Sequence, residues 1–206
     1  MLPLALLLAV QIAPDNPAVP YRQPQLAVTK ELAGVTFGGG NAVYFAGSRD
    51  QGKTFSKPVK VGEASALALG RHRGPRIAID GNAIVISAVV AGRSGGAEGD
   101  LVAWRSTDGG RSWSPPLTLN EVPNSAREGL HAMAAGKGVT FTAWLDLRNR
   151  ATQLFGARST DGGATWSKNV LIYQSPDGHI CECCHPSVAV DARGHVYAMW
   201  RNWLGG

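Results

Sequence analysis

The chain has 206 residues, of which 44% are hydrophobic and 17% are charged, with 26 glycines and a formal net charge of +5. This apolar fraction is too high for a disordered chain, and abundant glycine with sparse charge excludes a coiled coil or helix bundle. The basic residues are spread out with no run of five Lys or Arg, so we expect no nucleic-acid partner.

Residues 1–12 form a short apolar run that is typical of the hydrophobic region of a secretory signal. The run is shorter than the roughly 20 residues that a helix needs to span a bilayer. It lacks a basic N-terminal region, and Ala13-Pro14 is a poor cleavage site, so a buried strand or a misplaced start is the alternative. We expect residues 1–13 to be a signal segment, the protein to be secreted or periplasmic, and no integral membrane span.

Short apolar runs separated by turn-forming segments predict β-strands along the rest of the chain. In chain order, the predicted strands are residues 25–28, 35–37, 42–46, 76–79, 83–90, 101–104, 116–119, 130–134, 139–144, 153–157, 169–173, 187–190 and 195–200. The predicted fold class is therefore all-β.

Three eight-residue boxes share the pattern S-x-D-x-G-x-[ST]-[FW], at residues 48–55, 106–113 and 159–166. Glycine supplies the positive φ of a tight turn, and an Asp carboxylate with Ser or Thr hydroxyls can satisfy the turn's N–H groups. We therefore expect a structural role for the three box aspartates, Asp50, Asp108 and Asp161. Each box lies between the third and fourth strands of a unit of roughly 50 residues, which is the size of a propeller blade.

The predicted architecture is a β-propeller of four-stranded antiparallel blades, at about residues 24–63, 76–120 and 130–175, with an incomplete blade at 186–206. Residues 14–206 thus supply about three and a half blades, whereas propellers close with about 4–8. We expect the sequence to be an N-terminal fragment, with missing C-terminal blades or a second chain needed to close the ring.

The boxes resemble the Asp-box (BNR) repeats of the sialidase superfamily, whose fold is a six-bladed β-propeller. The resemblance covers residues 25–206 and is more specific for architecture than for activity. It implies an exported, glycan-directed protein that is similar to exo-sialidase-type glycoside hydrolases and binds a carbohydrate. A non-catalytic propeller that binds glycan or protein is one alternative, and a metal or redox protein is another.

In a four-stranded meander, the crossings between blades and the loops between second and third strands share the face opposite the boxes. The resemblance implies an arginine triad for a substrate carboxylate, an Asp acid/base and a Tyr–Glu nucleophile pair. The candidate catalytic carboxylates are Asp146, Glu128 and Glu182, with Asp100 as an alternative acid. The candidate substrate-binding residues are Arg73, Arg76, Arg148, Arg201 and His131. No tyrosine is clearly placed as a nucleophile, and an ordinary ion pair or solvated charge is the alternative at each position.

All three cysteines lie in the segment Cys181-Glu182-Cys183-Cys184-His185. A disulfide from Cys181 to Cys183 or Cys184 would leave one odd thiol, and export favours it. A soft ion such as copper(I) or zinc, held by the three thiolates and His185, is the second interpretation. The C-x-x-C-H spacing also matches a haem attachment motif, but Pro186 leads directly into a strand, so haem is not expected.

We expect these 206 residues alone to show no sialidase turnover, because the blades that they lack would supply part of the catalytic set. A fluorogenic sialoside assay on the purified chain checks this expectation. Robust hydrolysis would contradict it.

Overall fold

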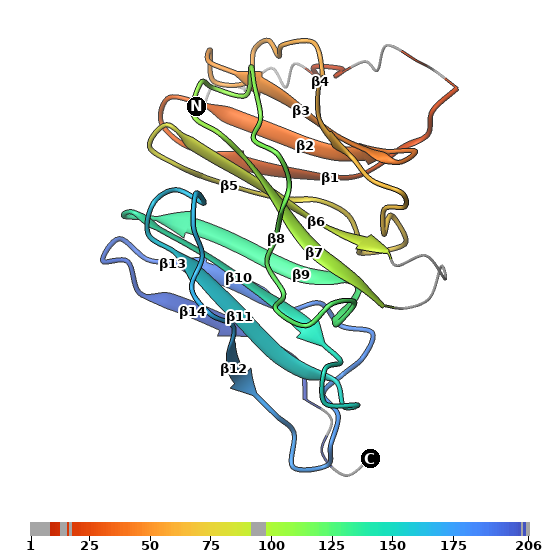
Figure 1. The fold of residues 1–206 in the computed structure, drawn as a ribbon. Coiled ribbons are helices and arrows are strands. Elements are labelled where there is room, and N and C mark those ends of the chain that lie inside the picture. Colours follow the sequence, from red (N-terminus) through yellow and green to blue (C-terminus); the bar gives the residue numbers. More distant parts are fainter. Residues whose placement is uncertain (1–8, 13–15, 17, 92–97, 203, 205–206) are drawn as a thin grey trace, which may run out of the picture.

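The computed structural model describes residues 9–12, 16, 18–91, 98–202 and 204, and within them every regular element is a β-strand (Figure 1). The strands form antiparallel sheets stacked in a fan, and no sheet closes on itself. The all-β prediction is confirmed. No helix in the described part of the chain could cross a lipid bilayer. Of the predicted signal segment, residues 1–8 and 13 lie outside the described residues.

The first twelve strands form three blades of four strands each in chain order, and the second and third blades lie in one eight-stranded sheet. The first blade is β1 (Tyr21–Val28), β2 (Ala33–Gly39), β3 (Ala42–Ser48) and β4 (Val59–Glu63). The second blade is β5 (Arg76–Asp80), β6 (Ala83–Ala91), β7 (Glu98–Ser106) and β8 (Leu117–Thr118). The third blade is β9 (Ala126–Gly136), β10 (Val139–Asp146), β11 (Gln153–Ser159) and β12 (Val170–Tyr173). A separate pair, β13 (Ser187–Val190) and β14 (Val196–Met199), follows. All the predicted strands are present, and β4 is an additional one.

The second and third blades are joined at one corner, where β7 pairs with β9 through Glu98–Arg127 and Gly99–Ala126. Beyond this corner, the ladder between β9 and β10 is interrupted, so that residues 127–130 bulge out of the sheet. Glu128 and Gly129 take positive φ angles of 47° and 78° in this bulge. The bulge redirects the side chains at the start of β9 towards the neighbouring loops.

The hydrophobic core is divided into layers that lie between neighbouring blades. Ile77, Ile79 and Ile84 of the second blade pack against the first blade. Ala78 and Val85, which alternate with them, pack against the third blade. Because side chains along a strand alternate between the two faces of a sheet, the second blade is apolar on both faces.

Each Asp box is a turn that satisfies its own polar groups. In the first box, Asp50 Oδ1 accepts hydrogen bonds from Ser48 Oγ (2.8 Å) and Thr54 N (2.9 Å), while Oδ2 accepts one from Thr54 Oγ1 (2.6 Å). Asp108 and Asp161 accept the same three bonds at 2.6 to 3.0 Å. The Thr54 hydroxyl, with the Thr54 N–H next, lowers the pKa of Asp50 to about 2. The box carboxylates are therefore held as anions inside their own turns.

The later boxes pack closely on the preceding blade. Gly110 has a φ of +88°, and a Cβ atom added there would collide with the buried ring of Phe45 in the first blade. Gly163 has a φ of +86° and lies against Val85 of the second blade in the same way. Gly52 occupies the equivalent position in the first box with a φ of +86°, but an added Cβ would meet nothing within 4 Å.

Because only the later boxes pack on a neighbouring blade, replacing glycine by alanine should destabilise the second box more than the first. Gly110→Ala and Gly52→Ala both place alanine in a left-handed conformation, but only Gly110→Ala forces an atom into the layer between blades. We expect Gly110→Ala to lower the free energy of unfolding by about 1–3 kcal/mol more than Gly52→Ala. Urea denaturation of both variants measures this difference, and equal losses would show that the box does not rely on this contact.

Candidate functional site

The turns and loops of the fan divide the molecule into two faces. The boxes and the turns between first and second strands form the box face, where the Asp80 carboxylate accepts a hydrogen bond from Gly138 N in the next blade. The crossings between blades and the loops between second and third strands form the crossing face. There Ile180 N donates to Thr152 O at 3.0 Å, so segments from different loops are hydrogen-bonded to one another.

Four charged side chains form a line of ion pairs on the crossing face, and we call them the carboxylate network. Arg73 pairs with Glu128. Arg127 Nη2 lies 3.7 Å from Glu128 Oε1 and 3.3 Å from Glu182 Oε2. The Arg73 side chain comes from the first crossing, Arg127 and Glu128 come from the β9 bulge, and Glu182 comes from the crossing before β13. The network therefore joins three separate segments of the chain.

The Glu182 carboxylate is also held from the loop between β10 and β11. Its Oε1 atom accepts a hydrogen bond from Thr152 Oγ1 at 2.9 Å, and His179 Nδ1 lies 3.3 Å away. Thr152 N donates to this same His179 nitrogen at 3.1 Å. Nδ1 is therefore an acceptor in this arrangement, and the hydroxyl of Thr152 is the donor that orients Glu182.

The network brings two predicted carboxylates together. Because Glu128 and Glu182 both lie within 4 Å of one Arg127 nitrogen, the oxygens that face it are no more than about 7 Å apart. Their side chains are 25% and 47% exposed. Glycoside hydrolases separate their two carboxyl groups by roughly 5–5.5 Å in retaining enzymes and 6.5–9.5 Å in inverting ones. The two side chains are thus partly exposed, and the upper limit of about 7 Å on their facing oxygens includes the spacing of a retaining pair.

The geometry does not support an acid–base role for Asp146. This side chain is fully buried. Its Oδ2 atom accepts hydrogen bonds from Ser125 Oγ and Trp144 Nε1, both at 2.8 Å, and from Arg148 Nη2 at 2.9 Å. Its Oδ1 atom accepts from Arg148 N and Nε. Both oxygens are engaged by the protein, so Asp146 orders the turn after β10.

Two predicted substrate arginines are likewise committed to protein groups. The Arg148 guanidinium pairs with Asp146 and lies over the Phe155 ring, with Cζ 3.9 Å from the ring centre. The buried Arg76 guanidinium donates to four carbonyl oxygens, those of His72, Gly74, Pro75 and His131. Burial lowers the pKa of Arg76. These contacts do not support the prediction that Arg76 and Arg148 bind substrate.

His131 is fully buried, and both of its ring nitrogens have partners inside the protein. Nδ1 lies 3.2 Å from Gly129 O and Nε2 lies 3.0 Å from Ser87 Oγ. Because a carbonyl can only accept, Nδ1 carries the proton and Nε2 accepts from the serine hydroxyl. Burial, assisted by the charge of Arg76, lowers the pKa of His131 to about 3. The predicted substrate contact from His131 is not supported.

Asp100, the alternative acid, anchors the crossing between the second and third blades. Its Oδ1 atom accepts hydrogen bonds from Asn120 Nδ2 at 2.8 Å and Asn124 N at 2.7 Å. The carboxylate thus fixes the backbone that leads into β9.

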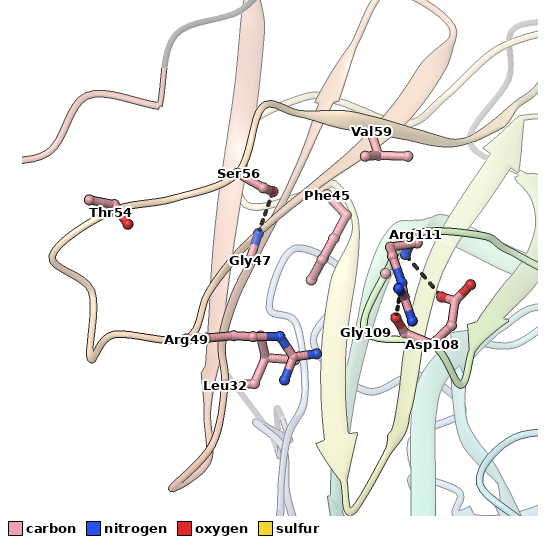
Figure 2. A pocket seen from close by; sticks show the side chains of 11 residues that line it. Leu32, Phe45, Gly47, Arg49, Thr54, Ser56, Val59, Asp108, Gly109 and Arg111 are labelled. Carbon is pink, nitrogen blue, oxygen red and sulfur yellow. Dashed lines mark hydrogen bonds between the residues drawn. The ribbon is translucent and has the colours of Figure 1, made fainter.

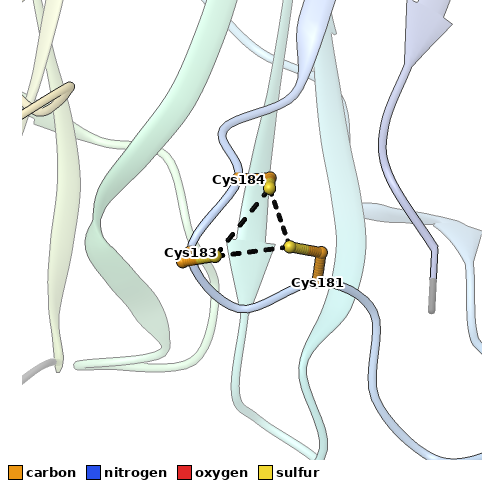
Figure 3. Close-up of side chains that lie close together, drawn as sticks. All are labelled: Cys181, Cys183 and Cys184. Atoms are coloured by element: carbon orange, nitrogen blue, oxygen red, sulfur yellow. Dashed lines mark hydrogen bonds between the residues drawn. The ribbon is translucent and has the colours of Figure 1, made fainter. Parts of the chain in front are cut away.

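The three cysteines bring their sulfur atoms together on the crossing face, and we call them the thiol cluster (Figure 3). The Sγ–Sγ separations are 2.7 Å for Cys181–Cys184, 3.5 Å for Cys181–Cys183 and 3.9 Å for Cys183–Cys184. The hydrogen bond to Cys181 raises the pKa of Cys184 to about 11. Burial raises the pKa of Cys181, but hydrogen bonds from Cys184 and Cys183 and the charge of Arg201 outweigh it, so its pKa is lowered.

His185, which the sequence grouped with these cysteines, is turned towards other partners. Its Nδ1 atom lies 2.8 Å from Pro186 O, and its ring is 6.2 Å from that of His72. Within the described residues, the group of potential ligand atoms at this point contains the three sulfurs and no imidazole nitrogen. Arg201, the last predicted arginine, lies beside the thiol cluster, and its carbonyl accepts from Cys181 N at 3.1 Å.

Comparisons with known proteins agree with the repeats and the fold. The family model "BNR/Asp-box repeat" matches residues 104–115 and 157–168, at the second and third boxes. This chain carries BNR/Asp-box repeats. A protein of unknown function from Dyadobacter fermentans has a similar structure, with a TM-score of 0.60 and 18% identity over 93% of this chain and 65% of that one.

Two solved glycoside hydrolases have folds similar to that of this chain as well. An alpha-L-arabinanase of Penicillium chrysogenum, complexed with arabinobiose, gives a TM-score of 0.55 and 14% identity, covering 86% of this chain and 56% of that one. The NanB sialidase of Streptococcus pneumoniae gives a TM-score of 0.62 and 12% identity, covering 90% of this chain and 28% of that one. These likenesses confirm the predicted sialidase-like propeller fold. This chain spans less than two thirds of the length of each of the three structures, and no curated protein matches its sequence.

A cavity of about 510 Å³ lies on the box face, between the first two blades (Figure 2). Its apolar wall includes Leu32 and Phe45, and its polar rim includes Arg49, Asp108 and Arg111. Asp108 is engaged within its own turn, and Arg111 donates to the Asp108 carbonyl at 2.9 Å. The cavity therefore offers no free acid or base, and we place the candidate site on the crossing face.

Sequence reasoning did not select Arg127, Thr152 or His179, although they position the two carboxylates. Arg127 could have been predicted, because it directly precedes the candidate Glu128 in a predicted crossing between blades. Thr152 and His179 gave no signal, because their proximity to Glu182 depends on how two loops meet.

The buried His131 predicts a specific dependence of stability on pH. Its folded pKa of about 3 lies below the unfolded value of about 6.5, so its stabilising contribution is present above pH 6.5 and is lost as the pH falls towards 3. We expect the free energy of unfolding to fall with acid in this window by up to about 1.4 kcal/mol per pH unit more in the wild type than in His131→Gln. Denaturation from pH 7 to pH 4 measures this difference. Parallel curves for the two proteins would contradict the assignment.

Proposed function

We propose that this protein is a glycan-directed propeller of the glycoside hydrolase type, and that its crossing face receives the carbohydrate. The observation that carries the proposal is the pair of accessible carboxylates, Glu128 and Glu182, held on one guanidinium where three segments converge. In the proposed reaction, one carboxyl group protonates the leaving oxygen and the other acts as nucleophile or base. The fold shared with a sialidase and an arabinanase supports this class of ligand.

The pairing of the arginines favours a neutral glycan over an acidic one. An arginine that binds a sugar carboxylate must present its guanidinium fork to the ligand. Here Arg73 is paired with Glu128 and Arg148 with Asp146, while Arg76 donates to carbonyl groups. An acidic sugar would have to displace these partners. We therefore propose a neutral oligosaccharide as the ligand, bound outside the cell as the apolar N-terminal run suggests.

A glycan microarray of neutral and sialylated oligosaccharides, arabinobiose included, tests the proposal, followed by calorimetry on the tightest ligand. We expect a neutral oligosaccharide to bind and Glu182→Gln to weaken it by about 10-fold or more, because a charge-assisted hydrogen bond is lost. The matched control is Glu31→Gln, which removes the charge of an exposed carboxylate on the box face.

Two results would overturn the proposal. If no glycan binds, or if Glu31→Gln weakens binding as much as Glu182→Gln, the crossing face is not the carbohydrate site. If sialylated glycans bind more tightly than all the neutral ones, the site is glycan-directed but the inference about charge is wrong.

A further inference from the structure

The loop that carries the thiol cluster is anchored on both sides. Before the cluster, Ile180 is 2% exposed in the layer between the third blade and β13, and it pairs with Asn202. After the cluster, Pro186 is buried and leads directly into β13. Between these anchors, all three sulfur atoms lie within 4.8 Å of one another (Figure 3). The backbone therefore holds the thiols together in a preformed arrangement.

The sulfur triangle matches the shape of a thiolate metal site. Metal–sulfur bonds of about 2.3 Å place two thiolates on one ion roughly 3.8–4.0 Å apart. The Cys181–Cys183 and Cys183–Cys184 separations, 3.5 and 3.9 Å, are close to this value. Only the Cys181–Cys184 pair, at 2.7 Å, would need to open. Since Cys183 is exposed, an ion could reach the sulfurs from solvent.

The ligand set selects the kind of ion. Thiolates favour soft ions such as copper(I) and zinc over hard ions such as magnesium and calcium. Zinc takes four ligands, so on these three sulfurs it would need a water molecule as its fourth ligand. Copper(I) accepts three thiolates alone. Arg201 adds a positive charge beside Cys181 and Cys184, which offsets the negative charge of such a complex.

We propose that Cys181, Cys183 and Cys184 bind one copper(I) ion in a three-coordinate thiolate site. Binding forms three copper–sulfur bonds and releases the thiol protons to solvent, without a change of oxidation state. This site is independent of the carbohydrate proposal. Because Glu182 lies between two of the ligands in the chain, the bound ion also restrains the loop from which this carboxylate projects.

Anaerobic titration of the reduced protein with copper(I), in competition with bathocuproine disulfonate, tests the site. We expect one ion per chain and a loss of affinity of at least about 100-fold in Cys183→Ser, since removing even an outer partner of a metal ligand costs about 10–100-fold. Cys183 is exposed, so the melting temperature of this variant should match that of the metal-free wild type. The control is His185→Ala, which should bind copper(I) within about 2-fold of the wild type. X-ray absorption of the loaded protein should show sulfur ligands only.

The same experiments can overturn the site. The site is contradicted if the reduced wild type has three titratable thiols and its affinity for copper(I) is no higher than that of Cys183→Ser. A large loss in His185→Ala, or nitrogen ligands in the absorption spectrum, would contradict the three-sulfur assignment. Displacement of copper(I) by an equal concentration of zinc would contradict the choice of ion, and a Cys181–Cys184 disulfide that persists in reductant would exclude the site.

Discussion

The apolar layer that each blade shares with the next is the interaction on which this molecule depends. The second blade shows it most clearly, because its strands bury isoleucines against the first blade and alternate residues against the third. The Asp boxes serve this packing. Since each box satisfies its carboxylate within its own turn, the glycines of the later boxes can lie flat on the preceding blade at Phe45 and Val85. The box face is thereby used for holding the blades together.

Because the box face holds the blades together, the loops of the crossing face are available to bind ligands. Loops on a rigid β scaffold can vary without disturbing the layers between blades. The crossing face carries the carboxylate network and the thiol cluster. Four non-glycine residues with positive φ also lie there, namely His72, Asn124, Glu128 and Arg150. Such strain persists only where the surrounding contacts fix it, and here Glu128 is fixed by two guanidinium groups.

The sequence was sufficient to predict the repeat, the order of the strands and the division into two faces. Those features follow from local patterns, namely the eight-residue boxes and the short apolar runs between them. The sequence also selected Glu128 and Glu182 as candidates, because each lies in a polar crossing segment, and the structure brings both to one guanidinium. The pairing of β7 with β9 and the bulge at residues 127–130 depend on contacts between distant strands, so no local pattern revealed them.

The predicted site residues that the structure does not support all direct their polar groups at protein partners. Asp146 and His131 were placed on the right face, but loop position does not reveal whether a side chain points out or in. Both are fully buried. Arg148 turns back onto Asp146 two residues earlier, and Arg76 reaches carbonyl groups of its own crossing and of β9. These polar side chains thus form hydrogen bonds and ion pairs with backbone carbonyl groups and buried side chains of the protein.

The central claim is that ligands meet this protein on the crossing face and not on the box face. Amide NMR of the labelled chain, recorded while the tightest oligosaccharide of the array is added, tests it most directly. The account predicts chemical-shift changes concentrated at residues 70–76, 126–130 and 178–186, with residues 48–55, 106–113 and 159–166 unchanged. Changes concentrated in the three boxes, with the crossing segments unaffected, would contradict it.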